Sequence, residues 1–165
     1  MERPSRMSAW MPPEDFIRLI ELGPLVSIDL LVVNAKGELL VGQRTNRPAQ
    51  GYWFVPGGRI SKGETLGKAF ASISLRELGQ ACGIADATLA GAYTHLYDDN
   101  FMGCEGIPTH YVALGYRIDL ELDLAALPAD QHGAYRWVAP TAPEAARADG
   151  IHDNTIAYFP ALTGT

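Results

Sequence analysis

Apolar residues in this chain fall into runs of two kinds, and each kind predicts a type of secondary structure. Continuous or alternating apolar runs predict β-strands, and apolar residues at every third or fourth position predict helices. The run over 25–33 is followed by a turn at 34–37 and a second strand over 38–44, which predicts a hairpin in a mixed sheet. The same patterns predict further strands over 88–97, 109–120 and 135–138.

Helical patterns flank these strands. Pro13, with acidic residues directly after it, predicts a short helix that ends at Gly23. The residues before it, 1–12, show no periodicity and are expected to be a mobile tail. At the other end of the chain, 143–150 and 156–162 predict one or two short helices that pack on the sheet.

The stretch over 45–78 combines a strand, a glycine pair and a helix. The aromatic and β-branched run over 52–55 predicts a strand, and Pro56 ends it because proline has no N–H for a β-ladder. Gly57 and Gly58 then predict a sharp turn with exposed backbone carbonyls and amides.

A helix is predicted directly after this turn. Ser61 and Glu64 have the spacing of a capping box, and apolar residues recur at helical intervals after them. The helix is expected over about 62–78, because Gly79 is typical of a helix end.

One face of this helix carries Leu66, Phe70, Ile73 and Glu77, so a carboxylate continues an inward-facing apolar row. A buried carboxylate needs a partner. A hard cation held by Glu77 and a carbonyl of the glycine turn would provide one. The alternative is that Glu77 lies at a frayed helix end and reaches solvent or an arginine.

The composition narrows the class of protein. A chain of 165 residues, 47% of them hydrophobic, suits a single domain over 1–165 with a full core. A net charge of −6 argues against nucleic acid as a partner, since tracking phosphates requires a basic face. Two cysteines make no disulfide framework, and neither a signal peptide nor a run long enough to span a bilayer is present, so we expect a cytoplasmic protein without a membrane partner.

Four polar residues in the predicted strands and loops are candidates for chemistry. Asp29 interrupts a core strand and is expected to face a polar cleft, or else an edge open to water. His95 and Tyr111 lie in strands. Each is either a site residue or a core residue whose polar atoms form hydrogen bonds within the protein. His132 lies in a predicted loop, where the alternative to a catalytic role is simple exposure to water.

Two segments carry a resemblance to a known family. Gly58, Glu64, Glu77 and Gly79 resemble the Nudix box, which departs here from its usual pattern at Ser72, Ile73 and Arg76. The run from Gln43 to Arg59, QRTNRPAQGYWFVPGGR, is similar to the GDP-mannose mannosyl hydrolase branch of that superfamily. The resemblance extends from about Trp10 to the end of the chain.

The resemblance implies a fold and a set of site residues. The implied fold is an α/β/α sandwich with a central mixed β-sheet, in a homodimer with one Mg²⁺ per subunit, or Mn²⁺ in its place. Gly57, Glu77 and Gln131 are the implied metal ligands. His132 is the implied general base, with Arg59 and Asp29 as further catalytic residues. The implied substrate-binding residues are Trp10, Met11, Phe16, Arg44 and Tyr111.

The implied function is hydrolysis of a nucleotide sugar, GDP-mannose or GDP-glucose, to GDP and the free sugar. Water would attack the anomeric carbon with inversion, and His132, with an unperturbed pKa of about 6.5, suits that proton transfer. One alternative is ordinary Nudix pyrophosphohydrolysis, with attack at phosphorus, although Ile73 and Arg76 leave few carboxylates for it. The other is a non-catalytic nucleotide-sugar-binding module, which the loss of the box arginine at Ser72 favours.

Overall fold

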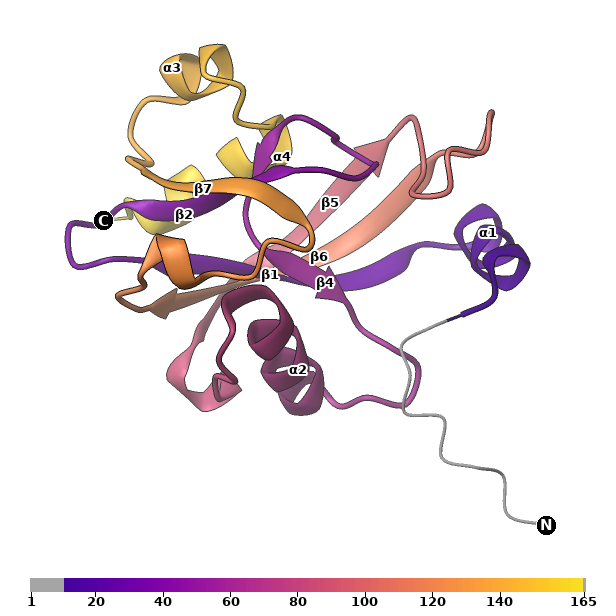
Figure 1. Cartoon of the computed structure of the whole chain (residues 1–165), viewed down its shortest axis with the longest axis horizontal. Helices are drawn as coiled ribbons and strands as arrows, with labels where there is room; N and C mark the ends of the chain where they lie inside the picture. Colours follow the sequence, from indigo (N-terminus) through magenta and orange to yellow (C-terminus); the bar gives the residue numbers. More distant parts are fainter. Residues whose placement is uncertain (1–10, 165) are drawn as a thin grey trace.

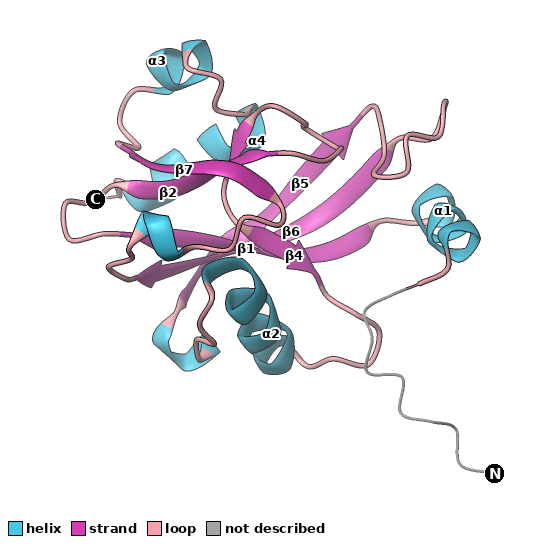
Figure 2. Ribbon diagram, viewed as in Figure 1, coloured by secondary structure: helices cyan, strands magenta, loops and turns pink. Residues whose placement is uncertain are grey.

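The computed structural model describes residues 11–164, which form an α/β fold around one seven-stranded mixed sheet (Figure 1, Figure 2). The strands are β1 (Leu25–Val33), β2 (Leu39–Arg44), β3 (Trp53–Phe54), β4 (Gly57–Arg59), β5 (Thr88–Tyr97), β6 (Thr109–Asp119) and β7 (His132–Val138). The α-helices are α1 (Pro13–Leu22), α2 (Leu66–Leu78), α3 (Pro143–Ala148), α4 (Asp153–Ile156) and α5 (Phe159–Leu162), with 3₁₀ turns η1 (Ile84–Asp86) and η2 (Leu124–Ala126). No helix within residues 11–164 is long and apolar enough to cross a membrane.

Strand β1 organises the sheet. It pairs in parallel with β6 along its whole length, from Leu25 opposite Tyr111 to Val33 opposite Asp119. On its other side, β4 pairs with residues 27–29 of β1, and β2 meets β1 only at Val33 opposite Leu39. The antiparallel pairs of β2 with β3 and β7, and of β5 with β6, complete the mixed sheet. The predicted hairpin and mixed sheet are confirmed.

Helices cover both faces of this sheet, as an α/β/α sandwich requires. On one face, Ile28, Leu30 and Val32 of β1 pack with the α2 side chains in a buried cluster. On the opposite face, Leu31 packs with residues of α4 and α5, including Phe159. Figure 1 shows α2 below the sheet and α4 above it. Because both faces are covered, β1 is apolar at nearly every position rather than alternating.

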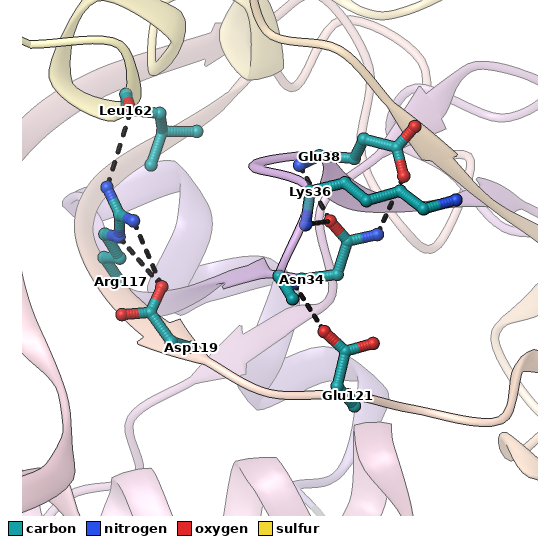
Figure 3. Close-up of polar contacts among 8 residues, drawn as sticks. Asn34, Lys36, Glu38, Arg117, Asp119, Glu121 and Leu162 are labelled. Carbon is teal, nitrogen blue, oxygen red and sulfur yellow. Dashed lines mark hydrogen bonds and ion pairs between the residues drawn. The ribbon is translucent and has the colours of Figure 1, made fainter.

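The Asn34 side chain makes most of the side-chain hydrogen bonds in the turn that follows β1, and the Ala35 N–H donates to the Glu121 carboxylate. The Asn34 side-chain oxygen accepts hydrogen bonds from the backbone N–H groups of Lys36 and Glu38, at 3.0 and 2.9 Å (Figure 3). Its amide nitrogen donates to the Glu38 carboxylate at 2.8 Å. Gly37, at φ 77°, adopts the left-handed conformation that closes the turn. The turn predicted at 34–37 is therefore confirmed.

The region between β3 and α2 differs from its prediction in three ways. The predicted strand over 52–55 contains only the two residues of β3. Helix α2 begins at Leu66 instead of about 62, because the Thr65 hydroxyl accepts the Lys68 N–H and caps the helix. The Ser61–Glu64 contact exists, with the Ser61 N–H donating to the Glu64 carboxylate at 2.9 Å, but it stabilises the loop before the helix.

The predicted glycine turn was wrong, because Gly57 and Gly58 lie in strand β4. The reason for glycine at these positions is close packing. A Cβ atom at Gly57 would lie 2.6 Å from both the Asp29 carboxylate and the Ile28 carbonyl oxygen. A Cβ atom at Gly58 would collide with the Arg76 guanidinium. The glycines therefore bring the β4 backbone against groups from β1 and α2.

Candidate active site

A cleft of about 410 Å³ lies beside β1 and β4. Seven residues that the sequence predicts as site residues line it: Phe16, Asp29, Arg44, Gly57, Arg59, Tyr111 and Gln131. Met11 is described but does not line the cleft, and Trp10 lies outside the described residues. The fold therefore brings together most of the candidates, which are up to 115 positions apart in the chain (Phe16 to Gln131).

Asp29 is the acidic group of the cleft, and it is buried in the paired strand β1, not at an open edge. The Tyr158 hydroxyl donates to Asp29 Oδ2 at 2.6 Å, and His95 Nδ1 lies 3.8 Å from the same oxygen. Burial raises the Asp29 pKa from 3.8 to about 7, against the opposing effects of the Tyr158 hydrogen bond and Arg44. Near neutral pH this carboxyl group can therefore either donate or accept a hydrogen bond.

Four arginines line the cleft, and two of them, Arg44 and Arg59, have no acidic partner within 4.0 Å among residues 11–164. The Arg59 guanidinium from β4 stacks on the Phe16 ring, with Cζ 4.5 Å from the ring centroid. Its Nη1 is buried without a hydrogen-bond partner among residues 11–164, so this N–H is free for a ligand. Arg44 at the end of β2 is held by its Nε donating to the Pro48 carbonyl at 2.9 Å. An anion such as a diphosphate suits this pair.

Strand β5 adds two cleft residues: His95, for which the sequence left a site role and a core role open, and Tyr97, which the sequence interpretation missed. His95 lines the cleft, and burial lowers its pKa to about 4, so its imidazole is neutral at pH 7. Tyr97 lines the cleft two positions further along, and the Tyr111 ring meets it edge-on. Burial raises the pKa of both tyrosines, which keeps both hydroxyls protonated. The two-residue spacing of Tyr93, His95 and Tyr97 was the available signal that one strand face is polar and aromatic.

Glu77 of α2 is buried, as its place on the apolar stripe predicts, whereas Leu66 at the start of that stripe is exposed. Burial raises the Glu77 pKa, and the neighbouring Arg76 opposes that shift. Arg76 Nε lies 3.3 Å from Glu77 Oε1, so the arginine partner of the alternative prediction is also present. Glu77 borders a smaller cavity of about 60 Å³, which shares Arg76 and Gln131 with the main cleft.

His132 is the first residue of β7, so its prediction as a loop residue was wrong. It is 2% exposed because β7 pairs with β2, where Gly42 leaves room for the imidazole. Nδ1 lies 3.3 Å from the Tyr135 hydroxyl and 3.9 Å from Glu77 Oε2, while Nε2 has no hydrogen-bond partner among residues 11–164. Burial, assisted by Arg44, lowers the pKa to about 4. His132 lines neither cavity, so the structure does not bring it into the cleft.

The oxygens of Gly57, Glu77 and Gln131 are a carbonyl, a carboxylate and an amide, which is the donor chemistry of Mg²⁺ and Mn²⁺. Within residues 11–164 no three His, Cys, Asp or Glu side chains cluster as a metal site. Ile73, in the box position of a carboxylate, is packed in the core. The residues therefore fit one divalent cation with a single carboxylate better than a site for several ions.

Comparison with known proteins gives concordant results. The NUDIX domain family model matches residues 23–159. The low-salt glycan biosynthesis protein Agl8 of Haloferax volcanii is 33% identical over 156 residues, which are 92% of this chain and 90% of that protein. Among solved structures, a MutT protein from Methanosarcina mazei is 20% identical, with a TM-score of 0.64, over 86% of this chain and 95% of that one. A MutT NUDIX hydrolase from Burkholderia pseudomallei is 25% identical, with a TM-score of 0.60, over 86% and 97% of the two chains.

Proposed function

Because this chain belongs to the Nudix family, whose model covers residues 23–159, we propose that it hydrolyses a nucleoside diphosphate sugar, GDP-mannose or GDP-glucose, to GDP and the free sugar. The relative named for glycan biosynthesis supports a sugar-linked substrate. The Gln43–Arg59 run, similar to the mannosyl hydrolase branch, supplies Arg44 and Arg59 to the cleft.

The observation that carries this proposal is the division of charge in the site. Helix α2 contributes one buried carboxylate, Glu77, whereas the main cleft is lined by the protonatable Asp29 and by four arginines, of which Arg44 and Arg59 have no acidic partner among residues 11–164. Attack at phosphorus by the usual Nudix route requires more metal-binding carboxylates than Glu77 alone. Attack at carbon requires that the charge of a departing diphosphate be neutralised, which two arginines and one cation can do.

Each group in the cleft then has a role in that reaction. Arg59 Nη1 and Arg44 bind the diphosphate, whose negative charge grows as the bond to the anomeric carbon breaks. Gly57, Glu77 and Gln131 would hold one Mg²⁺ or Mn²⁺, which would supply further neutralisation of that leaving group. Asp29, fixed by Tyr158, is available to hydrogen-bond a sugar hydroxyl.

The remaining requirement is a base for the attacking water. We propose His132, whose imidazole is neutral at pH 7 and whose Nε2 is unpaired among the described residues. Because His132 lines neither cavity, this role requires that substrate binding open Nε2 to the cleft. His95 already lines the cleft beside Asp29 and is the rival base that the geometry favours.

Hydrolysis of GDP-mannose in ¹⁸O-labelled water with Mg²⁺ tests the proposal. Attack at carbon places the label in mannose and first yields the β-anomer from the α-linked substrate. Label in a phosphate would show ordinary pyrophosphohydrolysis instead. Binding of GDP-mannose without any turnover would identify a nucleotide-sugar-binding module.

A further inference from the structure

Arg76 contacts Glu77, the carboxylate of the proposed metal site, although in the Nudix box its own position is that of a carboxylate. Its Nε lies 3.3 Å from Glu77 Oε1, and its side chain borders both the main cleft and the smaller cavity. The salt bridge joins two unequal partners, because the Glu77 side chain is 2% exposed and the Arg76 side chain 43%. The guanidinium therefore reaches from solvent onto a buried carboxylate.

Gly58 provides the space that this guanidinium occupies. A Cβ atom at Gly58 would collide with Arg76 Nη2 and lie 3.4 Å from Arg76 Cζ. The positive charge of Arg76 thus lies between the β4 backbone and the Glu77 carboxylate. A cation bound by the Gly57 carbonyl and Glu77 would need the same region.

The other charged and titratable groups around Glu77 leave Arg76 as its principal counter-charge. Arg44 and Asp130 act on the carboxylate with opposite signs, and the His132 imidazole lies 3.9 Å from Glu77 Oε2. Among residues 11–164, no lysine and no arginine other than Arg76 lies within 4.0 Å of Glu77.

We propose that Arg76 and a divalent cation compete for Glu77. In the metal-free protein the guanidinium neutralises the buried carboxylate, and binding of the metal displaces it toward the main cleft, where an anionic diphosphate can receive it. The metal ion and the Arg76 guanidinium repel each other when both contact the Glu77 carboxylate. Arg76 therefore weakens metal binding until its side chain moves away from Glu77. The proposal rests on the metal site of the proposed function and adds to it a residue that sets metal affinity.

Titration of the full chain with Mn²⁺, without nucleotide, tests this competition by calorimetry or by the electron paramagnetic resonance signal of free Mn²⁺. Arg76→Ala should bind Mn²⁺ about tenfold more tightly than the wild type, the factor that one charge-assisted contact typically carries. Arg76→Lys, which keeps the charge without the planar fork, should lie between the two. Lys68→Ala is the matched control, since it removes one positive charge from the exposed face of the same helix, and its affinity should match the wild type.

The proposal would be overturned by unchanged affinity in Arg76→Ala, by weaker affinity in that variant, or by the absence of Mn²⁺ binding in all of the proteins. Equal tightening in Lys68→Ala would also overturn it, because net charge would then explain the effect. The titration follows metal binding and not turnover. Tighter binding by Arg76→Ala, together with ¹⁸O in phosphate, would support the competition and reject attack at carbon.

Discussion

Asp29→Asn should make the protein more stable at neutral pH and change how its stability depends on pH. Asparagine keeps the size of the side chain, and its amide oxygen can still accept the Tyr158 hydrogen bond. What it removes is a buried carboxyl whose pKa rises from 3.8 to about 7 on folding. Because the folded state holds this proton more tightly than the unfolded chain, the group favours folding below pH 3.8, and that contribution is lost as the pH rises toward 7.

The size of the effect follows from the shift. The pKa of Asp29 rises by about three units on folding, and each unit corresponds to about 1.4 kcal/mol. Full ionisation of Asp29 therefore lowers the stability of the folded wild type by about 4 kcal/mol. At about pH 4.5, ionisation of Asp29 has lowered the stability of the wild type by only about 1 kcal/mol. Its stability therefore falls by about a further 3 kcal/mol by about pH 7.5. Relative to the wild type, the free energy of unfolding of Asp29→Asn should therefore rise by about 3 kcal/mol between these two pH values.

Urea unfolding of both proteins at the two pH values measures this difference directly. His132 is present in both proteins, so its contribution to the pH dependence largely cancels in the comparison. His95 lies 3.8 Å from Asp29 Oδ2, but burial lowers its pKa to about 4, so its imidazole is largely neutral in the folded wild type over this pH range. A constant difference between the two proteins across this range would show that Asp29 ionises at its ordinary pKa. A loss of stability in the variant that grows with pH would show that the ionised carboxylate is stabilised, and either result would refute the reasoning.

Three further predictions concern binding and turnover. Arg59→Ala should weaken GDP binding by about 1.5 to 3 kcal/mol in calorimetry, because it removes the proposed charge-assisted contact of Nη1 with the diphosphate. Arg147→Ala is the control, since Arg147 lies on exposed α3, and this variant should bind GDP as the wild type does. His132→Gln should lower kcat about 10²- to 10⁴-fold while GDP still binds; a larger loss in His95→Gln than in His132→Gln would assign the base to His95. Glu77→Gln should abolish Mg²⁺-dependent turnover while retaining a cooperative unfolding transition, and full turnover with unchanged metal affinity would reject Glu77 as a ligand.

Local patterns in the sequence predicted most of the secondary structure. Strand β5 has the predicted bounds of 88–97, and α1 begins at Pro13 and ends before Gly23 as expected. The helical spacing of Phe70, Ile73 and Glu77 correctly placed a carboxylate in the interior. These features depend on neighbouring residues, so periodicity and capping were enough to find them.

The errors arise where contacts between distant residues decide the structure. Gly57 and Gly58 have the composition of a turn, but Gly57 lies so close to the β1 backbone and the Asp29 side chain that a Cβ atom would not fit there, and the Arg76 guanidinium occupies the space beside Gly58. His132 is buried because β7 pairs with β2, an arrangement that no local pattern around Gln131 reveals. For the site, the family resemblance named seven of the cleft residues, but it gave no reason to examine Arg76 or Tyr158, whose roles depend on Glu77 and Asp29.

The parallel pairing of β1 with β6 also affects the order in which the protein folds. Every residue pair between these strands is 86 positions apart in the chain, as in Leu25 opposite Tyr111. Closing so long a loop costs entropy before any contact is gained, and such topologies fold slowly. During synthesis, β1 emerges long before its main partner, so the cleft around Asp29 can form only after residue 119 has left the ribosome. Until then, the apolar residues of β1 are exposed, and we expect nascent chains that stop before β6 to aggregate or to bind chaperones.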